Sequence, residues 1–531
     1  MSLDAIVDVS ITTLTSSPSR AGFGTPGLIA YFPTSVFPER VREYTSLTGM
    51  TDDGHLTSDA AYLMATALKA QNPSVQSWKV CRKALPSVQS IRVTPTVTTA
   101  GEVLSLTLNG TTVNYTILAG ASVATICTAL AALYAAVTGV TASDDTTHVT
   151  LTPKNVASAT LTVDGVANSQ VYTVTIDGTA FAFTSDSTAT ATEIRDGLQA
   201  LIIAGGYTAA EVVDNGSDAL DFAFASHAGA DLRETTSGGG ATMALSAEVS
   251  ARRLLAVGGA STGLTIKDLT ADPGIATDWA AIIAEDSDFY GVALDSQSEA
   301  EILALAAQVE TQRMIFVSGN IDTENADAGT TTDICSDLAA AAYDRSAILQ
   351  ANYNSQYAGC RWMGQMLPKD PGSATWAYKT LSGLTVSTLT AAQLTALDGK
   401  SANYYTSVGG VNITQKGYAA SGEWLDITRG VDWFQVRLQE RIYALLVNLD
   451  KIPYDQAGGL IYAEIYAQMQ EASKRGLLAP DTDDTPWVIT IPEVADISAA
   501  NKALRNFPDV EFSAYLAGAV HKITIQGTLS V

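Results

Sequence analysis

The stretch Gly417–Gly476 decides the fold, and it reads GYAASGEWLDITRGVDWFQVRLQERIYALLVNLDKIPYDQAGGLIYAEIYAQMQEASKRG. Apolar residues recur in it at i, i+3 and i+4, which predicts an amphipathic helix with a stripe formed by Val431, Phe434, Leu438, Ile442, Leu445 and Leu449. Four more apolar side chains widen the stripe, so this helix is expected to be covered on more than one side: Trp433, Val436, Tyr443 and Val447. Pro453 ends the helix, because proline cannot continue the hydrogen-bonded ladder.

Two further elements flank this helix. Residues 423–428 predict a short strand that turns into the helix, and a second helix is expected after the proline. Lys474 and Arg475 stand in the last turn of the second helix, directly before Gly476. Cations suit the negative end of a helix, and glycine suits the position that follows it. These residue types indicate a packed core or an assembly interface, and none of them indicates catalysis.

Composition and charge narrow the class of protein. The chain has 531 residues, of which 47% are hydrophobic and only 16% charged, so it is globular and long enough for several domains. Its formal charge of −25 argues against nucleic acid or an anionic membrane as a partner, because both are bound through Lys and Arg. Copies of such a chain repel one another, so their assembly must bury apolar surface or pair backbones.

The cysteines and the N-terminus indicate a soluble protein made in the cytoplasm. Cys81, Cys127, Cys335 and Cys360 lie far apart and form no CxxC pair, so we expect buried, reduced thiols. The chain begins MSLDAIVDVSITT, which lacks the basic and then apolar pattern of a signal peptide. No apolar run approaches the roughly 20 residues that span a bilayer.

Strands alternate with helices on both sides of a central, compositionally distinct region. The expected strands of this alternation are 28–32, 75–82, 289–294, 313–318, 346–351, 403–407 and 410–414. Helices are expected between most of them, and further short strands at 487–492 and 510–516. This order predicts an α/β fold with a mostly parallel sheet and helices on its faces.

The central region is rich in Thr, Ala, Val and Gly, and the chain repeats itself there. Leu106–Thr116 matches Val174–Thr184 at a constant offset of 68 residues. Each segment contains a two-residue turn, Asn109-Gly110 in the first and Asp177-Gly178 in the second. Both dipeptides favour the positive φ angles of a type I′ hairpin.

The same offset continues through a helix in each repeat. Ser122 is expected to cap the first helix, and Thr190 with Glu193 forms a capping box at the start of the second. Each repeat then reads strand, turn, strand, capped helix and a further hairpin. We therefore predict two duplicated small α+β domains, residues 87–165 and 166–254, inserted into the larger fold.

Both ends of the chain carry alternating strands. Residues 3–14 place Val7, Val9 and Ile11 on one face, and a tether of about a dozen residues follows. The last strand runs from 521 to 531, with one face formed by Ile523, Ile525, Leu529 and Val531. Such strands could add to a sheet of another chain or pair within one subunit, and the pattern leaves both open.

Patterns for catalysis or metal binding are missing from the sequence. The four histidines, at 55, 148, 227 and 521, show no zinc-ligand spacing. The glycine-rich segments 238–240 and 258–263 do not continue into a phosphate-binding loop, and the acidic groups lack EF-hand spacing. We therefore expect no catalytic residue, no cofactor and no metal.

Taken together, these pieces resemble a contractile tail sheath protein of a bacteriophage with a myovirus-type tail. The most specific parts are residues 46–83, SLTGMTDDGHLTSDAAYLMATALKAQNPSVQSWKVCRK, and the stretch Trp424–Gly476. Many sheath proteins carry a W-x-x-I-N-V-R-R type motif, and this chain departs from it with Trp424-Leu-Asp-Ile-Thr-Arg429 in the corresponding place.

The resemblance implies a discontinuous α/β core with domains inserted in it and extended terminal strands. The implied parts are an arm and tether over 1–27, core over 28–86 and 255–517, inserted domains over 87–165 and 166–254, and a second arm over 518–531. It also implies a structural subunit that polymerises as stacked hexameric rings around a tail tube. Contraction of that sheath drives the tube through the host envelope, without an enzyme active site.

The implied partners are other copies of the chain, the tail tube protein, and the baseplate and tail terminator proteins, with no nucleic acid and no membrane. The implied location is the tail sheath of the virion, after synthesis in the host cytoplasm. Strand pairing between subunits is assigned to Val7, Val9, Ile11, Ile523, Ile525, Leu529 and Val531. Lys474 and Arg475 are assigned to contact with an acidic tube.

Two other classes of protein remain as alternatives. A surface adhesin or S-layer-like protein would also use Thr-rich β repeats, although it would need a secretion signal. A cytosolic α/β enzyme would need a pocket that contains a titratable group with a perturbed pKa.

Overall fold

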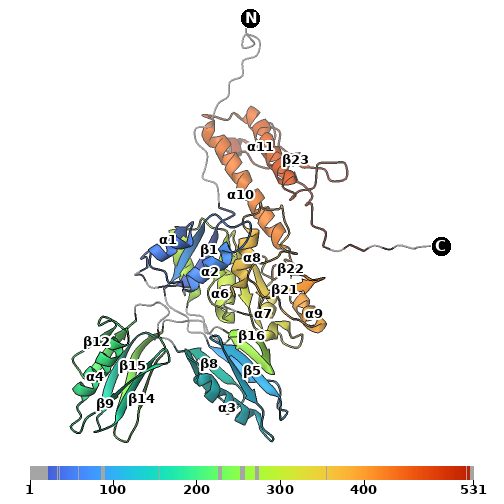
Figure 1. The fold of residues 1–531 in the computed structure, drawn as a ribbon. Helices are drawn as coiled ribbons and strands as arrows, with labels where there is room; N and C mark the ends of the chain where they lie inside the picture. The colour runs from blue at the N-terminus through green and yellow to red at the C-terminus, as the bar shows by residue number, and fades with distance from the viewer. Residues whose placement is uncertain are drawn as a thin grey trace, which may run out of the picture. The chain divides into compact units, whose positions relative to one another are not determined.

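The computed structural model describes residues 22–526 except 33, 35, 58, 85–89, 155, 225–229, 251–256, 269–273, 354–355, 522 and 525. The chain divides into two compact units. The large unit comprises Gly24–Pro368 and Ala377–Glu423, and the small unit comprises Met1–Phe23, Lys369–Trp376 and Trp424–Val531. The fold is mixed α/β with several separate sheets (Figure 1).

An eight-stranded sheet forms the centre of the large unit, in the order β2-β3-β1-β18-β19-β20-β21-β22. The inner six strands are parallel, and β2 and β22 pair antiparallel at the two edges. Its strands are β1 (Pro26–Tyr31), β2 (Val41–Tyr44), β3 (Trp78–Lys83), β18 (Gly291–Leu294), β19 (Ile315–Asn320), β20 (Ser346–Gln350), β21 (Asn403–Val408) and β22 (Val411–Gln415). The parallel sheet predicted from the alternation is confirmed.

Helices cover this sheet on both faces (Figure 1). They are α1 (Leu47–Asp52), α2 (Ala60–Lys69), α5 (Ile275–Glu285), α6 (Glu299–Val309), α7 (Ile334–Ala340), α8 (Ala358–Met366) and α9 (Ala391–Gly399). The apolar side chains of α5, α6 and α7 pack in one core with Ile29, Val292 and Phe316 of the sheet. Helices α2 and α8 contact each other, α2 packs on β1 and α8 packs on β19. The parallel strands read as apolar runs because they are covered on both faces.

Two regions with separate cores lie between β3 and α5 in the sequence. The first inserted region contains β4 (Ile91–Pro95), β5 (Val103–Leu108), β6 (Thr111–Thr116), α3 (Val123–Ala135), β7 (Val140–Asp144), β8 (Val149–Pro153), β16 (Val257–Thr262) and β17 (Leu264–Asp268). The second contains β9 (Val156–Gly165), β10 (Val171–Ile176), β11 (Thr179–Thr184), α4 (Ala191–Ala204), β12 (Val212–Asp214), β13 (Ala219–Ala223), β14 (Leu232–Thr236) and β15 (Thr242–Ser250).

Corresponding strands occupy corresponding places in the two inserted regions. The first has sheets β16-β5-β6 and β17-β4-β8-β7, and the second has sheets β14-β10-β11 and β15-β9-β13-β12. The predicted turns have positive φ, 48° and 81° at Asn109 and Gly110 and 50° and 82° at Asp177 and Gly178. The predicted caps, Ser122 of α3 and Thr190 of α4, each accept a hydrogen bond from the backbone of the first helical turn.

Strand pairing links segments across the boundaries that the repeat suggested. Strand β9 lies before residue 166, yet it pairs with β13 and β15 of the second inserted region. Strands β16 and β17 lie after residue 254, yet they pair with β5 and β4 of the first. The second inserted region is therefore nested within the first, and the first is nested within the large unit.

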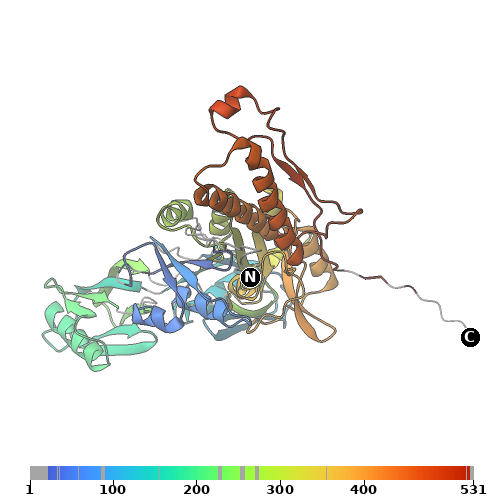
Figure 2. The same cartoon turned by 90° about the horizontal axis from the view of Figure 1, so that it is seen from above.

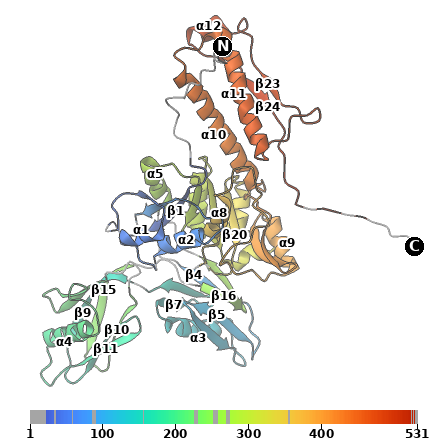
Figure 3. The same ribbon diagram turned by 45° about the horizontal axis from the view of Figure 1, so that its top comes forward.

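The small unit is built on a pair of long helices, α10 (Leu425–Asn448) and α11 (Tyr454–Lys474). The two helices contact each other and lie side by side in Figures 1 and 3, where both are labelled. Figure 2 shows the same orange-red helices from above. The unit also contains α12 (Ala499–Ala503) and the two-stranded sheet of β23 (Val488–Thr490) and β24 (Glu511–Ser513). The strand predicted over 423–428 is wrong, because α10 already begins at Leu425 with Trp424 as its N-cap residue.

Candidate interaction surfaces

The crevice where an open parallel sheet usually binds a ligand is filled with ion pairs in this chain. In such sheets ligands bind beyond the carboxyl ends of the strands, where the strand order reverses. That point lies between β1 and β18, since β3 flanks β1 on its other side. Lys83 at the end of β3 contacts Glu301 of α6 and lies 3.4 Å from Asp295, and all three side chains are fully buried. The backbone N–H of Tyr31 donates to Asp295 at 3.2 Å, which closes the end of β1 over the same carboxylate.

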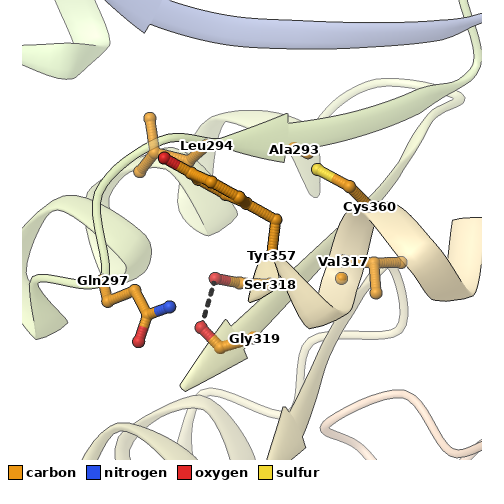
Figure 4. Close-up of a pocket in the computed structure, with 9 residues that line it drawn as sticks. Ala293, Leu294, Gln297, Val317, Ser318, Gly319, Tyr357 and Cys360 are labelled. Atoms are coloured by element: carbon orange, nitrogen blue, oxygen red, sulfur yellow. Dashed lines mark hydrogen bonds between the residues drawn. The ribbon is translucent and has the colours of Figure 1, made fainter. Parts of the chain in front are cut away.

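A small pocket lies near the carboxyl ends of β18 and β19 (Figure 4). Its walls include Leu294, Gln297, Ser318, Tyr357 and Cys360. It has room for about one water molecule, whereas ligand pockets usually measure about 300–1,000 Å³. Burial raises the pKa of the Cys360 thiol to about 12, so the thiol is protonated at neutral pH and is not a nucleophile.

The remaining groups with potential chemistry are isolated. All four cysteines are free and buried. Within the described residues, His, Cys, Asp and Glu side chains form no group of three that could hold a metal ion. His55 lies in an aromatic cluster, with ring-centre distances of 4.7 Å to Phe32 and 5.9 Å to Phe37. None of the helices that the structure describes is long and apolar enough to cross a membrane.

The first turns of α10 anchor the small unit. Leu425 and Arg429 are buried one turn apart on this helix. The Arg429 guanidinium donates to the carbonyl oxygens of Phe23 at 3.1 Å and of Lys369 at 2.8 Å. It therefore ties three segments that are distant in the sequence. A Cβ at Gly430 would lie 2.3 Å from the Cδ1 atom of Leu477, so a larger residue here would force the Leu477 side chain to move.

The end of α11 is fastened to its neighbours by Arg475. Its guanidinium forms ion pairs with Asp370 at 2.5 Å and with Glu471 at 3.0 Å. Glu471 also accepts a hydrogen bond from Arg441 of α10 at 2.7 Å. Burial opposes ionisation of Glu471, but the hydrogen bonds from Arg441 and Arg475 outweigh it and lower the pKa of this carboxyl.

The second half of α10 presents apolar side chains to solvent. No residue from Leu438 to Asn448 is buried, although the segment is rich in apolar residues. Tyr443 is 57% exposed and Leu446 60% exposed, and Val447 and Leu449 are exposed beside them. The prediction that this helix is covered on more than one side is therefore wrong for its second half. An exposed apolar patch of this kind is typical of a protein–protein contact.

The two-stranded sheet is a second exposed feature of the small unit. Strands β23 and β24 pair only with each other among the described strands, and they lie beside α11 (Figure 3). Val488, Phe512, Tyr515 and Leu516 in and after these strands are exposed. Two strands alone are marginally stable in water, and open edges accept further strands. This sheet is therefore suited to receive a strand from another segment or another chain.

The chain is pinned just before its C-terminal segment. Ala517 donates its N–H to the carbonyl of Leu477 at 2.9 Å. The imidazole of His521 lies edge-on to the Trp424 indole, with ring centres 4.3 Å apart, and its Nε2 is 2.9 Å from the Thr375 hydroxyl. These contacts fix the chain as far as His521.

The structure places few of the residues that the sequence assigned to contacts. Ile523 is 76% exposed and lies outside any strand. Six of the predicted pairing residues lie outside the described residues: Val7, Val9, Ile11, Ile525, Leu529 and Val531. Lys474 is exposed at the end of α11, whereas its neighbour Arg475 is held by Asp370 and Glu471.

Two features of these surfaces were not predicted from the sequence. The strands themselves were predicted, over 487–492 and 510–516, but their pairing into a separate open sheet of β23 and β24 was not, because 20 residues lie between them. The closed crevice at Lys83, Asp295 and Glu301 was missed because its members are distant in the sequence. Neither feature has a local signal that sequence periodicity could reveal.

Several solved structures that are similar to this chain are sheath proteins. One is the sheath tail protein of Desulfitobacterium hafniense, with 12% identity and a TM-score of 0.39 over 91% of this chain and 93% of that chain. A second is the sheath tail protein of Listeria innocua, with 11% identity and a TM-score of 0.35 over 89% of this chain and 90% of that chain. The contracted helical sheath of the anti-feeding prophage matches with 12% identity and a TM-score of 0.37 over 48% of this chain and 74% of that chain.

Sequence comparisons give no further relatives. No protein-family model matches the chain, and no curated protein matches it. At these identities and TM-scores the structural likenesses carry no weight for function. The function proposed for this chain therefore rests on its own residues and surfaces.

Proposed function

We propose that this chain is the subunit of a contractile tail sheath of a myovirus-type bacteriophage. The observation that carries the proposal is the open two-stranded sheet of β23 and β24, in a chain whose two ends both carry alternating strand sequences. Terminal segments that alternate in this way can add strands to such a sheet in a neighbouring copy. The quoted resemblance of residues 46–83 and 424–476 to sheath proteins supports the same function.

Exposed apolar surface supports self-assembly through the small unit. Just over half of the large apolar side chains that are exposed in the described part of the chain lie in this unit, which holds about a quarter of the residues. The chain as a whole has a net charge of −25, so contacts between copies must rely on apolar burial and backbone pairing. Stacked hexameric rings around a tail tube would use both.

Strand exchange would also suit a sheath that contracts. Backbone hydrogen bonds between an arm and a neighbour's sheet do not depend on how the rigid units of the two subunits are oriented. Arm residues Val7, Val9, Ile11, Ile523, Ile525, Leu529 and Val531 are proposed to make these bonds. The subunit would act mechanically in the virion tail, without an enzyme activity, driving the tube through the host envelope.

The proposed partners are the tail tube, the baseplate and the tail terminator, besides other copies of the chain. Lys474 is the better candidate for an acidic tube, because Arg475 is engaged within the small unit. The two inserted regions are proposed to be a duplicated pair of domains, since their strands follow one another in the same order in each sheet.

Electron microscopy of the purified protein tests the proposal. We expect hollow, thick-walled tubes or stacked rings from the full chain. Deletion of residues 1–15, or of residues 522–531 so that His521 keeps its contacts, should leave a folded monomer that does not polymerise. Normal polymers from both truncated chains would disprove strand exchange, and a discrete monomer or dimer of the full chain would favour the adhesin or the enzyme.

A further inference from the structure

One arginine of the second inserted region reaches into the first. Arg233 of β14 donates to the carbonyl oxygens of Ala135 at 2.7 Å, Val140 at 3.2 Å and Val137 at 3.3 Å. Ala135 is the last residue of α3, Val137 lies in the turn between α3 and β7, and Val140 is the first residue of β7. The guanidinium pairs with the Ala135 carbonyl at the end of α3 and complements the partial negative charge of that helix end.

A buried carboxylate completes the contact. Asp231 accepts the backbone N–H of Gly139 at 2.9 Å and forms an ion pair with Arg233 at 2.9 Å. Its own backbone is fixed by Asp177, whose Oδ1 accepts the Asp231 N–H at 2.9 Å and whose N–H donates to the Asp231 carbonyl at 2.9 Å. The side chains of Asp231 and Arg233 therefore both bind the backbone of residues 135–140 in the first inserted region.

The two equivalent turns of the repeat contribute differently to this contact. Asn109 donates its side-chain N–H to the carbonyl of Thr138 at 2.9 Å, within the first inserted region. Asp177 stands at the same place in the second repeat, 68 residues later. A carboxylate has no hydrogen to donate, and Asp177 instead accepts the N–H of Asp231. Asn109 therefore holds the segment that is bound, at Thr138, whereas Asp177 holds Asp231, which binds that segment.

The contact runs in one direction only. Strand β16 of the first inserted region occupies the place that β14 occupies in the second. Its sequence, Val257–Thr262, reads VGGAST and contains no charged residue. The first region therefore has no counterpart of Arg233 on this strand. The same contact could not be repeated to join a third repeat to the first region.

We propose that Asp231 and Arg233 form a docking surface whose partner is the α3–β7 turn, so that the two inserted regions move as a single rigid body. Two connections join the regions, one between β8 and β9 and one between β15 and β16, and the contact would keep the second region from turning relative to the first. This proposal does not depend on the sheath function, because it concerns contacts within one chain.

Amide hydrogen exchange on the full chain tests the proposal. In Arg233→Ala the Gly139 N–H, which Asp231 accepts, should exchange at least about tenfold faster than in the wild type, because opening of the contact becomes easier. Arg233→Lys should give an intermediate rate, since a single ammonium cannot reach three carbonyls. Arg195→Ala is the matched control, because Arg195 pairs with Asp196 and Asp214 of its own region.

The amides of β10 show whether the second inserted region stays folded in each variant. Unchanged exchange in β10 together with faster exchange at Gly139 would support the docking surface. Unchanged exchange at Gly139 in Arg233→Ala would overturn it. Equal acceleration of Gly139 in Arg195→Ala would also overturn it, because that result would trace the effect to a general loss of charge.

Discussion

The guanidinium carbon of Arg475 lies 4.7 Å from the centre of the Trp433 ring, so the end of α11 is held against α10 by a cation–π contact. Asp370 and Glu471 hold the same guanidinium from its edges. Arg475 therefore stabilises the small unit, although its position before Gly476 first indicated a cation at a free helix end. Its neighbour Lys474 is exposed. Arg475 is thus a structural cation, whereas Lys474 is accessible to a partner.

Replacement of Arg475 should weaken the small unit. Arg475→Ala removes a stacked, partly buried cation and should lower the free energy of unfolding by about 1–2 kcal/mol. Lys474→Ala is the matched control, and as a surface change it should stay within about 0.5 kcal/mol. Urea unfolding followed by tryptophan fluorescence measures both, and equal effects of the two substitutions would contradict the assignment.

The stability of the small unit should depend on the ionisation of Glu471. The pKa of this carboxyl is lowered in the folded chain, so its contribution is complete above the unfolded value of about 4.3 and is lost as pH falls through the lower folded value. Glu471→Gln removes that dependence. We expect the difference in unfolding free energy between wild type and Glu471→Gln to shrink as the pH falls from 6 to 3. A difference that is independent of pH would refute this role.

The buried ion cluster of the large unit should be sensitive to loss of its cation. Lys83→Met would leave Asp295 and Glu301 without their buried partner and should cost about 3–5 kcal/mol. Lys79→Met is the control, because Lys79 pairs at 2.6 Å with Asp286, whose side chain is 36% exposed. Because Asp286 stays accessible to water after the change, Lys79→Met should cost less than Lys83→Met. Calorimetry of both variants measures the difference, and similar melting temperatures would argue against a structural role for the cluster.

A charge on the open sheet should block assembly without unfolding the subunit. Val488 in β23 is 49% exposed, and Val488→Lys should leave stability within about 0.5 kcal/mol while it prevents strand addition. Val411→Lys is the matched control, since Val411 lies in the edge strand β22 of the large unit and is 56% exposed. Sedimentation should show polymers for the control only. Polymers of equal length from both variants would exclude β23 from the contact.

The surface that meets the tube should respond to Lys474 alone. Lys474→Glu should reduce co-assembly with an acidic tube and leave sheath-only polymers intact, because Lys474 is exposed at the end of α11. Reversal of Arg475 would be uninformative, since it would break the contacts with Trp433 and Asp370. Co-sedimentation with tube protein measures the effect, and unchanged co-assembly would remove Lys474 from the interface.

Much of the large unit could be predicted from local sequence patterns. The runs that contain Ile29, Val292 and Phe316 are apolar on both faces, as buried parallel strands require, and the structure places all three in one core. The turns at Asn109-Gly110 and Asp177-Gly178 and the caps at Ser122 and Thr190 were also predicted, because each depends on a few adjacent residues.

Other features could not be predicted because they depend on distant pairing. Leu264 pairs with Pro95 across 169 positions, and no local pattern specifies that partner. The start of α10 was placed too late, because Leu425 and Ile427 alternate with polar residues like a strand. The role of Arg475 depends on Asp370, about a hundred residues away.

The nested order of the inserted regions has a consequence for synthesis. The second inserted region is complete once the ribosome has released residue 250, while the first still waits for β16 and β17, and the central sheet waits for β18 to β22. The usual expectation is that the N-terminal domain folds first during translation. This chain should fold from the inside outwards, so the innermost region matures while β1, which pairs with β3, still lacks its other neighbour β18.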